Sequence, residues 1–352
     1  DDNTAFGYAA LFLNTTGTQN VAVGSGALDA NTTAANNTAI GYSAISANTT
    51  GTRNTALGAS ALATNTTASD NTAVGFSALL LNTTGEQNTA VGSLALDANT
   101  TGQSNTAVGY NSLTANTTGS ENTATGWQAL MSNTTARFNA AFGLGTLQNN
   151  TTGEQNTALG QQSLFDNTTA SNNTAVGYRA LFENTTGTAN TAVGKDAMLS
   201  NTTGSINTAV GEISLDACTT GGSNSCFGHA AGTAITTGSH NTCIGREAGA
   251  DVTTAQNNLL LGIDAGRSNS PSGTVTTSSN NVCLGNNNIA NLFCADTSIS
   301  SSDSRDKTDV ASFNIGLAWI EALRPVTYRW DRRTWYGTDA EPYGTPDGSK
   351  KR

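Results

Sequence analysis

NTAVGSLALDANTTGQS, residues 88–104, is the unit from which most of this 352-residue chain is built. Versions of it begin at an Asn every 17 residues from Asn3 to Asn258, and a seventeenth begins at Asn281 after a six-residue insertion. We number the positions of each unit from 1, its first Asn, to 17. Periodicity this strict is typical of a repeat architecture, in which each unit packs against its neighbours.

The first five positions of the unit predict a short strand. Position 5 is Gly in all 17 units, from Gly7 to Gly285. A Gly that is never replaced indicates a positive φ or a backbone approach too close for a Cβ atom. Position 4 is apolar in every unit except that of Thr125, and position 3 is Ala in the first thirteen units. Each unit therefore supplies a strand such as Thr89-Ala90-Val91.

The rest of the unit predicts a turn and a small core. An Ala-Leu pair, such as Ala61-Leu62, precedes Asn-Thr-Thr-Gly or Asn-Thr-Thr-Ala. We expect a turn there, with the Asn tolerating the left-handed region and bonding its own backbone, and the Gly supplying a positive φ. One unit has too few apolar side chains for a core, so stacking must build it. At roughly 4.8 Å per rung, sixteen rungs make a rod of roughly 75 Å.

These features predict an all-β solenoid, or β-roll, of 17-residue rungs. Because Ala and Cys make the inner column thin, we expect the Leu column at Leu11, Leu28 and Leu62 to pack between several chains wound about one axis. The expected assembly is a trimer. A monomeric solenoid is the alternative. The Asn-x-Ala-Val-Gly core of residues 3–290 resembles the β-roll of trimeric autotransporter adhesin heads, which implies architecture and no particular ligand.

The composition divides the chain into three segments. Residues 1–221 form the regular array, residues 222–296 form divergent terminal rungs, and residues 297–352 differ abruptly in composition. The chain opens inside a unit, at Asp1-Asp2-Asn3-Thr4, so we expect the intact protein to extend further at its N-terminus.

The charge of the chain disfavours two classes of partner, and the positions of its cysteines indicate packing. Residues 1–302 carry 6 Lys and Arg against 17 Asp and Glu, a net charge of −11, which disfavours nucleic acid and anionic membranes. No run approaches the roughly 18 apolar residues of a membrane span. Cys226, Cys243 and Cys283 occupy position 3, where we expect small buried side chains. We expect no cofactor and no metal ion.

Four weaker signals compete with ordinary repeat positions. Gly187 and Gly194-Lys195-Asp196 have the wrong spacing for a phosphate loop. His229 and His240 could form a metal pair in neighbouring rungs, but surface positions are the default. Twelve Asn-Thr-Thr turns, from Asn14 to Asn201, are N-glycosylation acceptors that we interpret as turns. Their stacked Thr residues could bind ice, although adjacent Thr side chains in a turn should splay apart.

The last segment reads as a short α+β unit. Three of the four Trp residues lie in it, after the Ser-rich stretch 298–302. Residues 313–323 predict an amphipathic helix that Pro325 ends, and residues 326–330 alternate like a strand.

Two blocks of this segment resemble the peptidase S74 family of intramolecular chaperones, found at the end of endosialidases and many tail fibres. Residues 302–307, SDSRDK, match its S-D-x-R-x-K, and residues 316–330 match its G-L…I…L-x-P-V-x-Y-x-W. The resemblance implies a Ser–Lys dyad, with Ser302 as nucleophile, Lys307 as general base and Asp303 in support. It also implies that the Ser301–Ser302 bond is cut once, after the trimer assembles. The family module continues beyond Arg352, so we expect this chaperone to be truncated.

The combined expectation is a structural and binding protein, with self-cleavage as its only catalytic step. It would be the shaft and host-attachment part of a phage tail fibre, located in the virion. Its partners would be two further copies of itself and a host-surface receptor, either a glycan or an outer-membrane component. A bacterial trimeric cell-surface adhesin is the alternative, and an ice-binding solenoid is a more distant one.

Overall fold

The chain divides into two compact units, Asp1–Asn291 and Leu292–Arg352. The computed structural model describes residues 2–291, which belong to the first unit. The expected helix at 313–323 and the expected strand at 326–330 lie outside the described residues.

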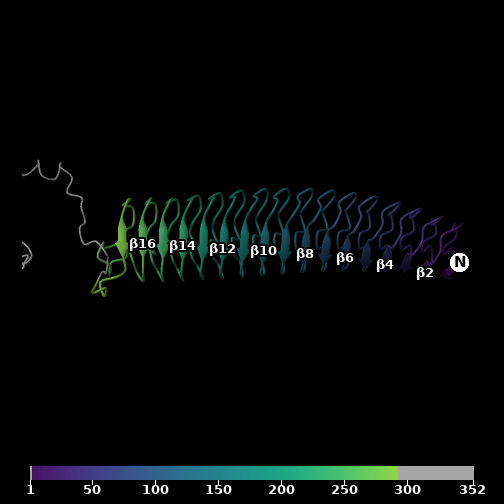
Figure 1. The fold of residues 1–352 in the computed structure, drawn as a ribbon, viewed down its shortest axis with the longest axis horizontal. Coiled ribbons are helices and arrows are strands. Elements are labelled where there is room, and N and C mark those ends of the chain that lie inside the picture. Colours follow the sequence, from purple (N-terminus) through teal and green to yellow (C-terminus); the bar gives the residue numbers. More distant parts are fainter. Residues whose placement is uncertain (1, 292–352) are drawn as a thin grey trace, which may run out of the picture. The chain divides into compact units, whose positions relative to one another are not determined.

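Residues 2–291 are an all-β solenoid, as predicted, and contain 17 strands in one parallel sheet. The strands lie side by side along the length of the stack (Figure 1). Their bounds are β1 Thr4–Phe6, β2 Val21–Val23, β3 Thr38–Ile40, β4 Thr55–Leu57, β5 Thr72–Val74, β6 Thr89–Val91, β7 Thr106–Val108, β8 Thr123–Thr125, β9 Ala140–Phe142, β10 Thr157–Leu159, β11 Thr174–Val176, β12 Thr191–Val193, β13 Thr208–Val210, β14 Ser225–Phe227, β15 Thr242–Ile244, β16 Leu259–Leu261 and β17 Val282–Leu284.

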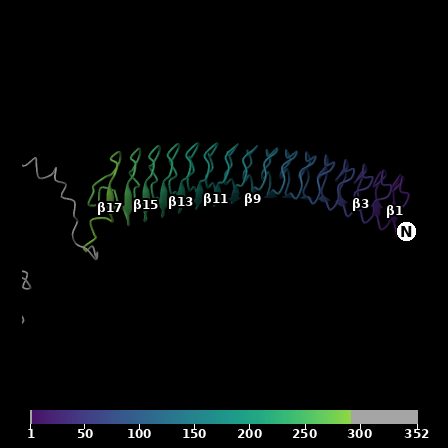
Figure 2. The ribbon, with the colours of Figure 1, turned by 45° about the horizontal axis from the view of Figure 1, so that its top comes forward.

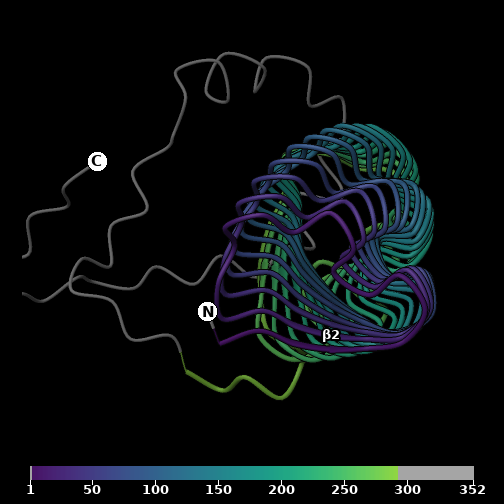
Figure 3. The same ribbon diagram turned by 90° about the vertical axis from the view of Figure 1, so that its right-hand side faces the viewer.

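Each rung is one repeat unit, stacked in register on the next. Ala73 of β5 pairs with Ala90 of β6, so identical positions face each other. The six-residue insertion is absorbed between β16 and β17, where Leu260 pairs with Cys283. The stack curves gently (Figure 2), and successive rungs are rotated about its long axis (Figure 3), as expected for a twisted parallel sheet.

The Gly at position 5 is required for both of the predicted reasons. Gly92 has a φ of 139°, which L side chains rarely adopt. A Cβ atom there would lie 2.5 Å from the carbonyl oxygen of Gly109 in the next rung. The positive φ and the close backbone approach recur along the stack. Adjacent rungs can therefore approach each other at this column only because Gly has no side chain.

The Leu column packs inside the chain, so the expectation that it would pack between chains was wrong. Ala95 and Leu96 are both fully buried, although they are adjacent in sequence. Leu94 and Leu96 adopt left-handed φ values of 57° and 54°, which break the in-and-out alternation of an extended chain. The same conformation recurs at positions 7 and 9 along the stack, and Leu62 and Leu28 are likewise fully buried.

Two Asn columns form hydrogen-bonded ladders inside the rungs. At position 1, the backbone N–H of Asn105 donates to Oδ1 of Asn88, at 3.0 Å. At position 12, Nδ2 of Asn116 donates to Oδ1 of Asn99, at 2.9 Å, and to the carbonyl oxygen of Gly119, at 2.9 Å. The position-12 ladder satisfies buried amides that would otherwise cost stability.

The chain bends at Asn-Thr-Thr, but the hydrogen-bonded turn covers the Ala-Leu pair before it, at residues 93–98, and the predicted conformation was wrong. The Asn side chain bonds its own backbone three residues on, as Asn48 does to the carbonyl oxygen of Gly51. However, neither residue has a positive φ; the left-handed residue is at position 17, for example Arg53 with a φ of 59°. The backbone N–H of Arg53 donates to the carbonyl oxygen of Ala35 in the preceding rung, and that of Asn54, the next residue, joins the position-1 ladder at 2.9 Å.

The terminal rungs differ from the regular rungs at two buried positions, 3 and 9. In β14 and β15, Cys226 and Cys243 replace Ala at position 3, while Gly232 and Gly249 replace Leu at position 9. A Cβ atom at Gly232 would lie 2.6 Å from Sγ of Cys226, and one at Gly249 would lie 2.5 Å from Sγ of Cys243. The position-3 thiol, together with Ile235 Cδ1 at 3.0 Å from the Cβ position of Gly232, thus occupies part of the space that Leu fills in regular rungs.

Candidate functional site

The outward side chains of the sheet form the main candidate surface. We call positions 2, 4 and 6 of the rungs the outer sheet face. Position 3 points into the core, so positions 2 and 4 point outward on either side of it. Large apolar side chains remain exposed along this face, including Ile40, Leu57 and Leu159 at position 4 and Tyr42 and Trp127 at position 6. Exposed apolar side chains that gather on one face are typical of a binding surface.

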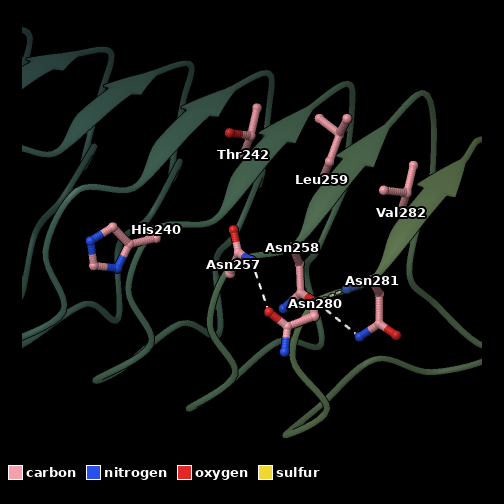
Figure 4. Close-up of a pocket in the computed structure, with 8 residues that line it drawn as sticks. All are labelled: His240, Thr242, Asn257, Asn258, Leu259, Asn280, Asn281 and Val282. Atoms are coloured by element: carbon pink, nitrogen blue, oxygen red, sulfur yellow. Dashed lines mark hydrogen bonds between the residues drawn. The ribbon is translucent and has the colours of Figure 1, made fainter.

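An open groove lies at the C-terminal end of the same face (Figure 4). It is lined by His240, Thr242, Asn257, Asn258, Leu259, Asn280, Asn281 and Val282. Nδ2 of Asn257 donates to Oδ1 of Asn280 at 2.8 Å, and Nδ2 of Asn281 donates to Oδ1 of Asn258 at 2.8 Å. The Asn side chains on one wall are thus bonded to each other between rungs, and Thr242, Leu259 and Val282 line the opposite wall.

The two histidines do not form the suggested pair. They belong to one rung, not to neighbouring rungs: His229 is at position 6 and His240 at position 17. His240 lines the groove, whereas His229 does not. Within residues 2–291, no group of three His, Cys, Asp or Glu side chains could hold a metal ion.

Lys195 forms ion pairs with two carboxylates, Glu212 and Asp196. Its Nζ lies 3.0 Å from Oε1 of Glu212 in the next rung and 3.7 Å from Oδ2 of Asp196. The hydrogen bond to Glu212 raises the pKa of Lys195 above its usual range. The residue therefore belongs to an exposed ion pair between rungs, and no phosphate-binding loop is formed around it.

The Asn-Thr-Thr acceptors are structural. All twelve Asn residues except Asn14 are fully buried, and their amide nitrogens donate to the preceding rung or to their own turn. A glycan on such a nitrogen would remove both the burial and the bonds. The following Thr is also engaged, as Oγ1 of Thr100 donates to the carbonyl oxygen of Thr117 at 3.0 Å.

The cysteines of the described residues are buried free thiols, as predicted for position 3. Burial raises the pKa of the Cys218 thiol to about 11. A hydrogen bond with the Cys243 thiol, together with burial, raises the pKa of Cys226. Since thiolates are the reactive form, Cys218 and Cys226 serve packing and are poor nucleophiles.

The predicted cleavage site lies outside the described residues. This holds for the nucleophile Ser302, the base Lys307, the supporting Asp303 and the bond from Ser301 to Ser302.

Among the described residues no helix is long and apolar enough to span a membrane.

One surface feature escaped the unit-by-unit interpretation. From Tyr8 to Tyr110 the aromatic residues at position 6 recur every second rung, a period that a single 17-residue consensus averages away. Comparing position 6 between alternate units would have found it.

Comparison with known proteins bears on the C-terminal segment. A search of curated proteins found no relative that matches the chain. Residues 302–348 match the model of the peptidase S74 family, described as the chaperone of endosialidase. The chain therefore carries a chaperone-of-endosialidase segment at its C-terminus, preceded by a parallel β-solenoid.

Proposed function

We propose that this chain is the shaft and host-attachment part of a phage tail fibre, matured by release of its C-terminal chaperone. The observation that carries the proposal is the family match that begins at Ser302, soon after 17 stacked rungs. The mature protein would be part of the virion, and its receptor a glycan or outer-membrane component of the host.

The solenoid has the properties that a shaft needs. Every rung is joined to the next by parallel strand pairing and by backbone bonds outside the strands, such as Thr89 N–H to the carbonyl oxygen of Asn105 at 2.8 Å. Since no described residue interrupts this bonding from β1 to β16, bending or extending the stack must break several bonds per rung. Such a stack can hold a distal surface at a fixed distance from a particle.

A registration device is useful for such a stack. Neighbouring rungs are nearly identical, as in β5, β6 and β7, which all read Thr-Ala-Val. Two or three copies aligned with an offset of one rung would lose only the contacts of the end rungs. A domain that sets the alignment before the shafts meet prevents this error, which is why we propose a trimer whose chaperone folds first.

The Leu column lends no support to the trimer, because Leu28 and Leu62 are buried within one chain. The trimer rests instead on the chaperone segment at residues 302–348.

Release would proceed by attack of Ser302 Oγ on the carbonyl carbon of Ser301. The hydroxyl proton would pass to Nζ of Lys307, and the amide nitrogen of Ser302 would leave as an amine, giving an ester. Water would then hydrolyse the ester and free both ends. A Lys can serve as the base when desolvation by assembly lowers its pKa.

The test is to express the complete gene as wild type, Ser302→Ala and the matched control Ser304→Ala, and to compare sizes on a denaturing gel. The wild type and Ser304→Ala should yield a shortened product, and Ser302→Ala should remain full length. An uncleaved wild type, or a cleaved Ser302→Ala variant, would overturn the proposed maturation.

A further inference from the structure

The exposed aromatic residues at position 6 follow a two-rung period. From β1 to β7 an aromatic ring alternates with a small side chain, and the ring positions are 34 residues apart. The rings are 46–85% exposed. They belong to Tyr8, Tyr42, Phe76 and Tyr110, which we call the aromatic row.

The backbone fixes the spacing of the aromatic row. The carbonyl oxygen of Tyr42 accepts a bond from Ser60 in the next rung at 2.8 Å, and that of Phe76 accepts one from Leu94 at 3.0 Å. Because every rung is pinned in this way, ring positions two rungs apart are separated by about 9.6 Å, twice the ~4.8 Å spacing of paired strands. The small residues Ala59 and Ser93 leave gaps between successive rings.

The surface beside the aromatic row is uncharged. Positions 2, 4 and 6 carry no charged residue from β1 to β11, and the first charge is Lys195, which follows β12. Next to the row, position 4 supplies aliphatic side chains such as Ile40, and position 2 supplies Thr hydroxyls such as Thr38. The chain as a whole is acidic, with a net charge of −10, so its acidic residues are kept off this strip.

We propose that the aromatic row binds an extended, neutral, β-linked glycan chain, with each ring stacked on every second sugar. The inference rests on the proposed attachment function and names its ligand class. Pyranose rings present an apolar C–H face to an aromatic ring, and their hydroxyls suit neighbouring Thr side chains. In an extended β-linked chain alternate sugars turn the same face to one side, so the repeat is a disaccharide, whose length is close to two rungs.

Charge and shape select against other glycans. An acidic glycan would meet the negative field of the chain with no basic group along the row to offset it. A coiled α-linked glucan presents no straight series of faces. The gaps between rings also fit separate sugars better than they fit the continuous apolar face of a second copy.

The test uses the whole chain and titration calorimetry with four soluble probes. Hexasaccharides of β-1,4-linked glucose and β-1,4-linked N-acetylglucosamine represent the proposed class, and maltohexaose and oligosialic acid represent the excluded ones. We expect binding of at least one β-linked probe and none of the other two.

A swap variant tests the spacing independently of composition. Phe76→Ser combined with Ser93→Phe keeps the number of aromatic rings but breaks their two-rung period. We expect it to bind the β-linked probe about tenfold more weakly, because only part of the row can then stack at once. Phe12→Ser, which removes a 74% exposed ring outside the row, is the matched control and should bind like the wild type.

Several results would overturn the inference. Equal affinity of the swap variant and the wild type would show that ring spacing is irrelevant. Failure of both β-linked probes, with host-cell attachment intact, would remove the glycan site and leave the proposed function standing. Failure of the probes together with a changed oligomeric mass of the swap variant would instead identify the row as a contact between copies.

Discussion

Replacing one Asn in the middle of the position-12 ladder should lower the free energy of unfolding more than replacing the last Asn of the ladder. Asn116 takes part in three ladder bonds. Its Nδ2 donates to Asn99 at 2.9 Å and to Gly119 at 2.9 Å, and its Oδ1 accepts from Asn133 at 2.9 Å. Cys is the natural replacement at this position, since Cys218 follows the ladder in the next rung after its end.

The magnitude follows from what each partner keeps. In Asn116→Cys, the carbonyl oxygen of Gly119 still accepts from Asn105 at 2.9 Å. Asn133 likewise keeps its bond to Ala136 at 3.2 Å. Oδ1 of Asn99 loses its only ladder donor and stays buried. Three lost bonds and one new unsatisfied oxygen should cost about 3 kcal/mol in the free energy of unfolding.

The end of the ladder provides the control. Oδ1 of Asn201 is buried and accepts no hydrogen bond among the described residues, because Cys218 follows it. Asn201→Cys removes its bonds to Asn184 and Gly204 but only moves the unsatisfied oxygen back by one rung. With the number of unsatisfied oxygens unchanged, we expect a cost of about 1 kcal/mol.

The assay is urea unfolding followed by circular dichroism, with amide hydrogen exchange to locate the change. Exchange should accelerate in β6–β8 for Asn116→Cys, because the ladder joins Asn116 to the rungs on either side and neighbouring rungs couple most strongly in a stacked repeat. Equal costs for the two variants would refute the directional ladder as the source of stability.

Three further experiments test packing and burial. Gly92→Ala should cost about 2–5 kcal/mol from backbone strain and overpacking. Gly26→Ala, where the nearest atom to a Cβ is 3.5 Å away, should cost only about 1 kcal/mol in the same unfolding assay, from its left-handed φ of 69°. Gly232→Leu should destabilise the terminal rungs, and adding Cys226→Ala should restore at least about 1 kcal/mol of the free energy of unfolding. If the effects of the two substitutions simply add, the Cys226 thiol and a side chain at position 232 do not compete for the same space. When the chain is secreted from a glycosylating host, mass spectrometry should find no N-glycan on the folded array. Glycans on the Asn-Thr-Thr acceptors of a folded product would contradict the burial of these Asn residues.

The period of the array, its strands and its invariant Gly were predictable because each follows from one-dimensional spacing. Thr89-Ala90-Val91 forms a strand in any stack that places Ala inward, and Gly92 marks the column where rungs are too close for a side chain. These features depend only on residues within one unit and its copies.

The side on which Leu96 packs was not predictable in the same way. Its burial depends on left-handed conformations at Leu94 and Leu96 itself, which ordinary L residues rarely adopt and which no Gly announces in that unit. The stack imposes them, since both neighbouring rungs fix the backbone by hydrogen bonds. The position-12 ladder was missed for a related reason: an Asn in a turn motif and an Asn in a buried ladder have the same local sequence.

The central claim is that the chain is a fibre shaft released from its own chaperone at the Ser301–Ser302 bond. Intact-mass spectrometry of the protein expressed from the complete gene tests it most directly, combined with sedimentation of the native product. The claim predicts a shaft fragment that ends at Ser301, a second fragment that begins at Ser302, and a native mass of three shafts. A single uncut chain, or a cut at another bond, would contradict it.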